Sequence, residues 1–99
     1  MNISTLMDMA RQRAQIRSDR HMANRLGITS TSLSMWRRGL TVPTPGHLIN
    51  LCELAQIPPE VGLAWRNAWQ AEGEVREICE RIANQVTDSA GVTLPSEAA

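Results

Sequence analysis

The stretch SDRHMANRLGITSTSLSMWRRG, residues 18–39, contains two short segments of helical pattern that meet at a single glycine, Gly27. Ser18 is well placed to cap the first segment. A glycine directly after Leu26 is the residue that most readily ends a helix in the left-handed conformation. The second segment is rich in Ser and Thr and ends in WRR. The stretch therefore predicts two short helices joined by a tight turn.

The residues around this turn match the demands of a helix-turn-helix unit. Two helices that cross at a steep angle need a small residue at the crossing, and Ala23 supplies it four positions before Gly27. The hinge must also be buried by apolar residues before, within and after the turn. These are Met22, Leu26, Ile28, Leu33 and Trp36. Each of these positions holds the residue type that the geometry requires.

The segment MANRLGITSTSLSMWRRGLTVP resembles the helix-turn-helix of the lambda-repressor/Cro-like family, in which LGI, then S-x-W-R-R-G, then a proline follow one another. The next segment, TPGHLINLCELAQIPPEVGLAW, resembles the fourth and fifth helices of that domain. The resemblance covers residues 18–69 and extends to small regulators of filamentous phages and prophages. It implies an all-α, five-helix domain and, because most family members bind DNA, a transcriptional regulator such as a phage repressor.

The resemblance also implies which residues contact DNA. Hydroxyl side chains at the start of the second helix allow close approach to DNA, although they discriminate bases weakly. By position in the family's motif, Ser30, Thr31 and Met35 point into the major groove, and Ser30 also suits the helix start. Arg is suited to phosphate and guanine. The full predicted set is Arg20, Thr29, Ser30, Thr31, Ser34, Met35, Arg37, Arg38 and Thr44.

One position departs from the family. Members often have Gln at the first position of the unit, where it contacts a phosphate, whereas this chain has Asp19. We expect Asp19 to favour the helix start or to pair with a nearby arginine, and Arg20 to take over the phosphate contact. Two simpler interpretations stay open: Arg37 and Arg38 would favour a helix C-terminus without DNA, and an exposed Met35 would suit a protein partner.

The formal net charge of the 99 residues is zero, but the charge is unevenly distributed. Residues 1–52 contain seven arginines and two aspartates, a net charge of +5, whereas residues 53–99 contain three arginines and eight acidic residues, a net charge of −5. This asymmetry indicates a basic working face and a separate acidic part.

Apolar residues recur with helical spacing over residues 5–16, 44–55 and, in a longer run, 59–85. We predict one helix for the last run, about 40 Å long if unbroken, with Gly73 as its weakest point. Four residues beyond Gly73 form an apolar stripe that we expect to pair two copies into a homodimer: Val75, Ile78, Cys79 and Ile82. The alternative is that the helix folds back at Gly73 and packs on the first helix.

The predicted organisation is a DNA-binding domain over residues 1–72, a helical extension over 73–86 that forms the dimer, and a disordered tail over 87–99. No stretch approaches the roughly 18 apolar residues of a membrane span, and the N-terminus lacks the pattern of a signal peptide. We therefore expect a cytoplasmic protein. Cys52 and Cys79 are predicted to be free thiols, and no Cys/His spacing indicates a metal site.

Three classes of function remain. The leading hypothesis is a dimeric regulator that binds double-stranded DNA sequence-specifically, without a cofactor or a small-molecule ligand; repressor, Cro-like antagonist and activator are all compatible with it. The second is a protein-interaction module on the same fold, antitoxin-like or RNA polymerase-binding, which the acidic half and Asp19 favour. The third is a structural phage protein. No nucleophile arrangement or phosphate-binding glycine loop indicates an enzyme.

Overall fold

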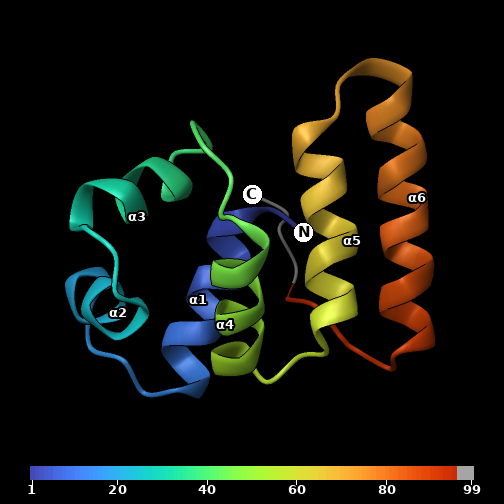
Figure 1. Ribbon diagram of the computed structural model, residues 1–99. Coiled ribbons are helices and arrows are strands. Elements are labelled where there is room, and N and C mark those ends of the chain that lie inside the picture. The colour runs from blue at the N-terminus through green and yellow to red at the C-terminus, as the bar shows by residue number, and fades with distance from the viewer. Residues whose placement is uncertain (96–99) are drawn as a thin grey trace.

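The computed structural model describes residues 1–95, which form six α-helices and no β-strand. The helices are α1 (Ile3–Arg13), α2 (Asp19–Leu26), α3 (Ser30–Arg37), α4 (Pro45–Ala55), α5 (Pro59–Gln70) and α6 (Gly73–Ser89). In Figure 1, α2 and α3 lie at one end of the molecule, α1 and α4 in the middle, and α5 and α6 at the other end as an antiparallel pair. The predicted all-α class is confirmed. None of the helices in residues 1–95 has the length and apolar character needed to cross a membrane.

Local capping residues set the helix boundaries. The Ser18 hydroxyl accepts a hydrogen bond from the backbone N–H of His21 at the start of α2. Gly27 ends α2 with a left-handed φ of 71°, as predicted. The Asn2 side chain caps α1 by accepting from the backbone N–H of Thr5, and Thr29, rather than the predicted Ser30, caps α3.

A single apolar core joins all six helices, with Ala83 as its fully buried residue from α6. Its largest fully buried side chains include Leu6, Met7, Met22, Leu33, Leu48, Leu51 and Val61. Gly62 allows α5 to approach α4 closely, because a Cβ atom at this position would overlap the Cys52 Sγ atom. This core fixes the position of α3 relative to α1 and α4.

The predicted long helix over residues 59–85 is divided in two. Ala71 is extended, and Gly73 has a φ of +58°, a conformation that costs glycine little. The chain therefore reverses at Gly73, which corrects the continuous helix and agrees with the fold-back in the predicted alternative, but α6 packs on α5 rather than on α1. The contact is fixed by the Trp65 indole N–H, which donates to the Thr87 hydroxyl at 3.0 Å.

The predicted tail boundary at residue 87 is also wrong. Thr87 is buried inside α6, and its hydroxyl donates to the carbonyl oxygen of Ala83 at 2.7 Å. Beyond the helix, Val92 and Leu94 still pack against the core. Residues 87–95 therefore belong to the folded unit, and the rest of the predicted tail, residues 96–99, lies outside the described residues.

Candidate nucleic-acid interface

Helices α2 and α3 are joined by a short turn, and each buries one face. Met22, Ala23 and Leu26 of α2 are buried, as are Leu33 and Trp36 of α3. The backbone N–H of residue 28 donates to the carbonyl oxygen of Ala23 at 3.0 Å and closes the turn. Because Leu33 and Trp36 both point into the core, the opposite face of α3 is directed outward.

The outward face of α3 carries most of the predicted contact residues. Ser30, Thr31 and Ser34 are exposed on this face, and Met35 is half-buried at its edge. The Thr29 hydroxyl accepts from the backbone N–H of Ser32 at 3.0 Å, so it caps α3 while staying exposed. The structure therefore brings these five hydroxyl and thioether side chains together along the outward side of α3.

The remaining predicted residues lie around this face. Arg38 is exposed at the C-terminal cap of α3, and its guanidinium forms no hydrogen bond or ion pair within residues 1–95. Arg20 is exposed in the first turn of α2. Thr44 caps α4, and it shares a shallow hollow of about 290 Å³ with Met35, Trp36 and other residues. The structure thus groups eight of the nine predicted residues in the outer surface of α2, α3 and the start of α4.

Arg37 is the exception, because its side chain is used inside the protein. Its Nε and Nη2 atoms donate to the two carboxylate oxygens of Asp19 at 3.2 and 2.8 Å. Its Nη1 atom donates to Asp8 Oδ1 at 2.6 Å and to the hydroxyl and carbonyl oxygens of Ser4 at 2.8 and 3.1 Å. One guanidinium therefore ties α3 to both α1 and α2.

These bonds change the interpretation of two residues. The hydrogen bond to Asp19, against the cost of burial, raises the pKa of Arg37 above its ordinary value, so the side chain stays charged. Its donors already have partners, and we therefore remove Arg37 from the predicted contact set. The pairing of Asp19 with a nearby arginine, which the sequence predicted, is confirmed.

The loop before α2 is held by a second arginine that the sequence did not single out. Arg11 donates from Nη2 to the carbonyl oxygen of Arg17 at 2.6 Å, and its Nη1 atom lies 3.7 Å from Asp19 Oδ1. One feature of the sequence could have indicated that an arginine in this region is paired inside the protein: Asp8 and Asp19 are the only acidic residues in the first 52 positions, among seven arginines.

The part of the chain that contains α3 has no unpaired acidic residue. No acidic residue occurs between Asp19 and Glu53, and Asp19 itself is paired with Arg37. The same stretch contains the exposed cations Arg20, Arg25 and Arg38. An anion that approaches the outer face of α3 therefore meets cations and hydroxyls from this part of the chain.

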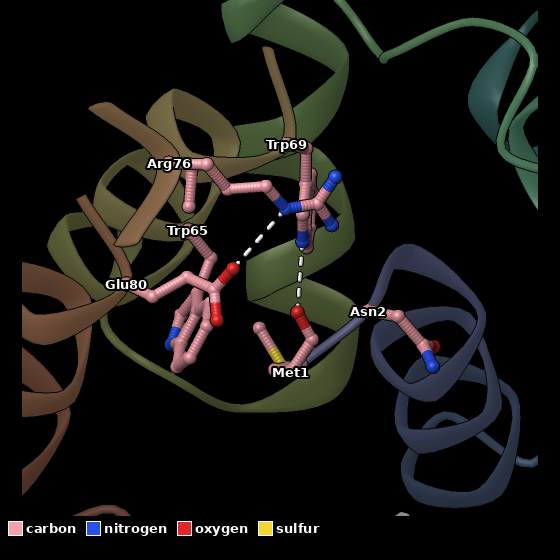
Figure 2. A pocket seen from close by; sticks show the side chains of 7 residues that line it. Met1, Asn2, Trp65, Trp69, Arg76 and Glu80 are labelled. Carbon is pink, nitrogen blue, oxygen red and sulfur yellow. Dashed lines mark hydrogen bonds and ion pairs between the residues drawn. The ribbon is translucent and has the colours of Figure 1, made fainter. Parts of the chain in front are cut away.

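A hollow at the other end of the molecule does not form a comparable site. Figure 2 shows Trp65, Trp69 and Arg76 around this space of about 140 Å³, near the N-terminus. The Trp69 indole N–H donates to the carbonyl oxygen of Met1 at 2.8 Å, and Arg76 is paired with Glu80. The indole N–H of Trp65 is bound to Thr87, so the polar groups of this hollow already serve the packing of the N-terminus, α5 and α6.

The predicted dimerisation residues separate into two groups. Val75, Ile78 and Ile82 remain on the surface, with 61%, 39% and 51% of their area exposed. Cys79 is half-buried and packs against the core, so it is not part of the exposed stripe. Both cysteines are free thiols, and no group of three or more potential metal ligands occurs in residues 1–95.

Comparisons with family models, curated proteins and solved structures give no match to this chain.

Proposed function

We propose that the protein is a sequence-specific DNA-binding regulator that places α3 in the major groove of double-stranded DNA. The observation that carries this proposal is the outer face of α3, which presents Ser30, Thr31 and Ser34 in a stretch of chain without an unpaired acid. An α-helix fits the major groove, where base edges are distinguishable. The α2-turn-α3 arrangement matches the way in which helix-turn-helix proteins present such a helix.

The proposed contacts follow from the chemistry of each exposed side chain. Ser30 and Thr31 hydrogen-bond to base edges, and Met35 covers a thymine methyl group. Arg38 binds a phosphate or a guanine. Arg20, Thr29, Ser34 and Thr44 contact the DNA backbone or its neighbouring bases and fix the register of the protein on the duplex.

Arg37 has a supporting part in this proposal. By joining Asp19, Asp8 and Ser4, it holds α3 at a fixed angle to α1 and α2. A reading helix must keep its angle, because displacing it would misplace every base contact at once. The two adjacent arginines therefore have different tasks, one within the protein and one at the DNA.

The family resemblance adds a biological context. In a lambda-repressor/Cro-like regulator of a phage or prophage, a dimer occupies two half-sites and represses a promoter by covering it. Selection of bound duplexes from a random DNA library tests the proposal directly. Enrichment of a short palindromic sequence, altered by Ser30→Ala or Thr31→Ala, is the expected result. No enrichment by the folded protein would reject it.

A second candidate, protein binding through the same surface, is favoured by one observation. Leu40 is 59% exposed in the loop after α3, close in sequence to an open hollow lined by Ile28, Met35, Val42 and others. Apolar residues that gather around a hollow, rather than a single exposed side chain, are typical of protein contacts. In that case Leu40→Ser would abolish partner binding, whereas for a DNA regulator the same change would leave the selected DNA sequence unaltered.

A further inference from the structure

The outer surface of α6 carries an apolar stripe that nothing in residues 1–95 covers. Val75, Ile78 and Ile82 follow one another at spacings of three and four, so they share one face of the helix. They are three of the five large hydrophobic residues that are exposed within residues 1–95. A different face of α6, with Ala83 and Thr87, packs on α5. The stripe is therefore not needed to close the core of one copy.

The charges beside the stripe indicate what covers it. In heptad terms Val75 and Ile82 occupy a positions, Ile78 a d position, and Glu74 and Arg81 successive g positions on the same flank. Neither Glu74 nor Arg81 forms an ion pair within residues 1–95. Two opposite charges seven residues apart on one flank form a self-complementary pattern.

We propose that α6 binds a second copy of itself in antiparallel orientation, with Glu74 of each copy beside the partner's Arg81. In an antiparallel pair the two g flanks face each other, so the contact forms twice around a two-fold axis. A parallel pair would instead place both charges beside the partner's Cys79 and the partner's Val86, where neither finds a counterion. Charge complementarity thus selects the second copy and its direction.

The centre of the stripe agrees with this register. With Glu74 beside the partner's Arg81, the two-fold axis passes between residues 77 and 78, next to the middle residue of the stripe. Ile78 then packs at the centre of the interface, and Ile82 lies over the start of the partner helix, where the partner's Gly73 has no side chain.

The orientation of the stripe suits a protein that acts on one side of a duplex. At about 100° per residue, the stripe lies roughly a quarter of a turn around α6 from the face that packs on α5. The two-fold axis of an antiparallel pair then runs along the direction from α6 to α5. Figure 1 shows α3 beyond α5 in that direction. Both α3 helices therefore project to the same side of the dimer.

This inference rests on the proposed function only in its last step, since the pairing itself needs no DNA. Sedimentation equilibrium of the full chain, without DNA, tests it separately. The wild type is expected to dimerise, and Ile78→Glu to be monomeric. A wild type that stays monomeric up to about 1 mM would overturn the proposal, as would a dimer that Ile78→Glu leaves intact.

Charge reversal tests the direction of pairing. Glu74→Arg alone, or Arg81→Glu alone, places like charges beside each other at both of the two symmetry-related contacts of the dimer. Each single variant is expected to raise the dimer dissociation constant about tenfold. The double variant E74R/R81E restores opposite charges and is expected to return within about threefold of the wild type. Glu53→Arg on α4 is the matched control, and circular dichroism checks that every variant is folded.

Single reversals without effect, or a double variant as weak as the singles, would overturn the antiparallel register. The outcome is separable from DNA binding. A dimer with these properties that selects no DNA sequence would reject the proposed function and leave the pairing in place. A monomer that selects DNA would do the reverse.

Discussion

Replacing Arg37 by Ala tests whether Arg37 stabilises the fold while the adjacent Arg38 is left for DNA. The Arg37 side chain is only 22% exposed, and it donates five hydrogen bonds to Asp19, Asp8 and Ser4. The contact with Asp8, which is 67% exposed, contributes less than about 1 kcal/mol because solvent screens it. The two-point contact with Asp19 and the bonds to Ser4 contribute more, since they are less exposed.

We expect Arg37→Ala to lower the free energy of unfolding by about 2–4 kcal/mol. Arg37→Lys should recover only part of this loss, because an ammonium group cannot bind both Asp19 oxygens and also reach Ser4. Arg38→Ala is the matched control: its side chain has no partner within residues 1–95, so its effect should stay within about 0.5 kcal/mol.

Urea unfolding followed by tryptophan fluorescence measures these differences, since Trp36, Trp65 and Trp69 all lie in or against the core. The reasoning predicts that Arg37→Ala is less stable and Arg38→Ala is not. If Arg37→Ala instead kept its stability and lost only its DNA affinity, Arg37 would be a contact residue and the assignment made from its hydrogen bonds would be refuted.

Three further predictions concern the core. Thr87→Val keeps the side-chain volume but leaves the buried Trp65 N–H without its acceptor, so unfolding by urea should show a loss of about 1–3 kcal/mol. Gly62→Ala should cost a similar amount, about 1–3 kcal/mol, by overlap with Cys52 Sγ, and G62A/C52A should recover most of it. Burial raises the pKa of Cys52 from 9.0 to about 11, which favours the neutral thiol in the fold. The raised pKa of Cys52 therefore contributes fully to the free energy of unfolding below pH 9. This contribution, of up to about 3 kcal/mol, is lost as the pH rises from 9 to 11. The chain has no Tyr and no Lys, the other side chains that commonly titrate in this pH range, so Cys52→Ala should make the stability depend less on pH. A variant whose stability falls as steeply between pH 9 and 11 as that of the wild type would contradict this prediction.

The first four helices could be predicted from the sequence because local signals fix them. Ser18, Gly27, Thr44 and Pro45 each set a boundary through a cap, a left-handed residue or a first-turn proline. The burial of Leu33 and Trp36 follows from their spacing, and so does the outward direction of Ser30, Thr31 and Ser34. Most of the candidate interface is therefore visible in residues 18–39 alone.

The reversal after α5 could not be predicted in the same way. Apolar spacing continues through Gly73, so the pattern favours one continuous helix. The contact with α5 is made by Ala83 and Thr87, which are small or polar and give no strong signal in sequence, whereas the large Val75 and Ile82 remain exposed. Periodicity identifies an apolar face but does not identify the helix, or the copy, that covers it.

The task of Arg37 also depends on tertiary structure. Its partners Ser4 and Asp8 lie 33 and 29 residues away in sequence, and only the packing of α3 on α1 brings them within reach. Arg37 and Arg38 are equivalent in the sequence pattern. One guanidinium turns toward the carboxylates of α1 and α2, and the other stays at the end of α3 in solvent.

The salt dependence of binding to the selected duplex tests most directly whether the α3 surface binds DNA. Fluorescence anisotropy over a range of salt concentrations gives the slope of log affinity against log salt concentration for each variant. Removal of a phosphate contact at Arg38 should weaken binding and reduce the slope by about 1 per subunit. Asn84→Ala, at an exposed position of α6, should change neither. Identical affinity and slope for Arg38→Ala and the wild type would contradict the proposed interface.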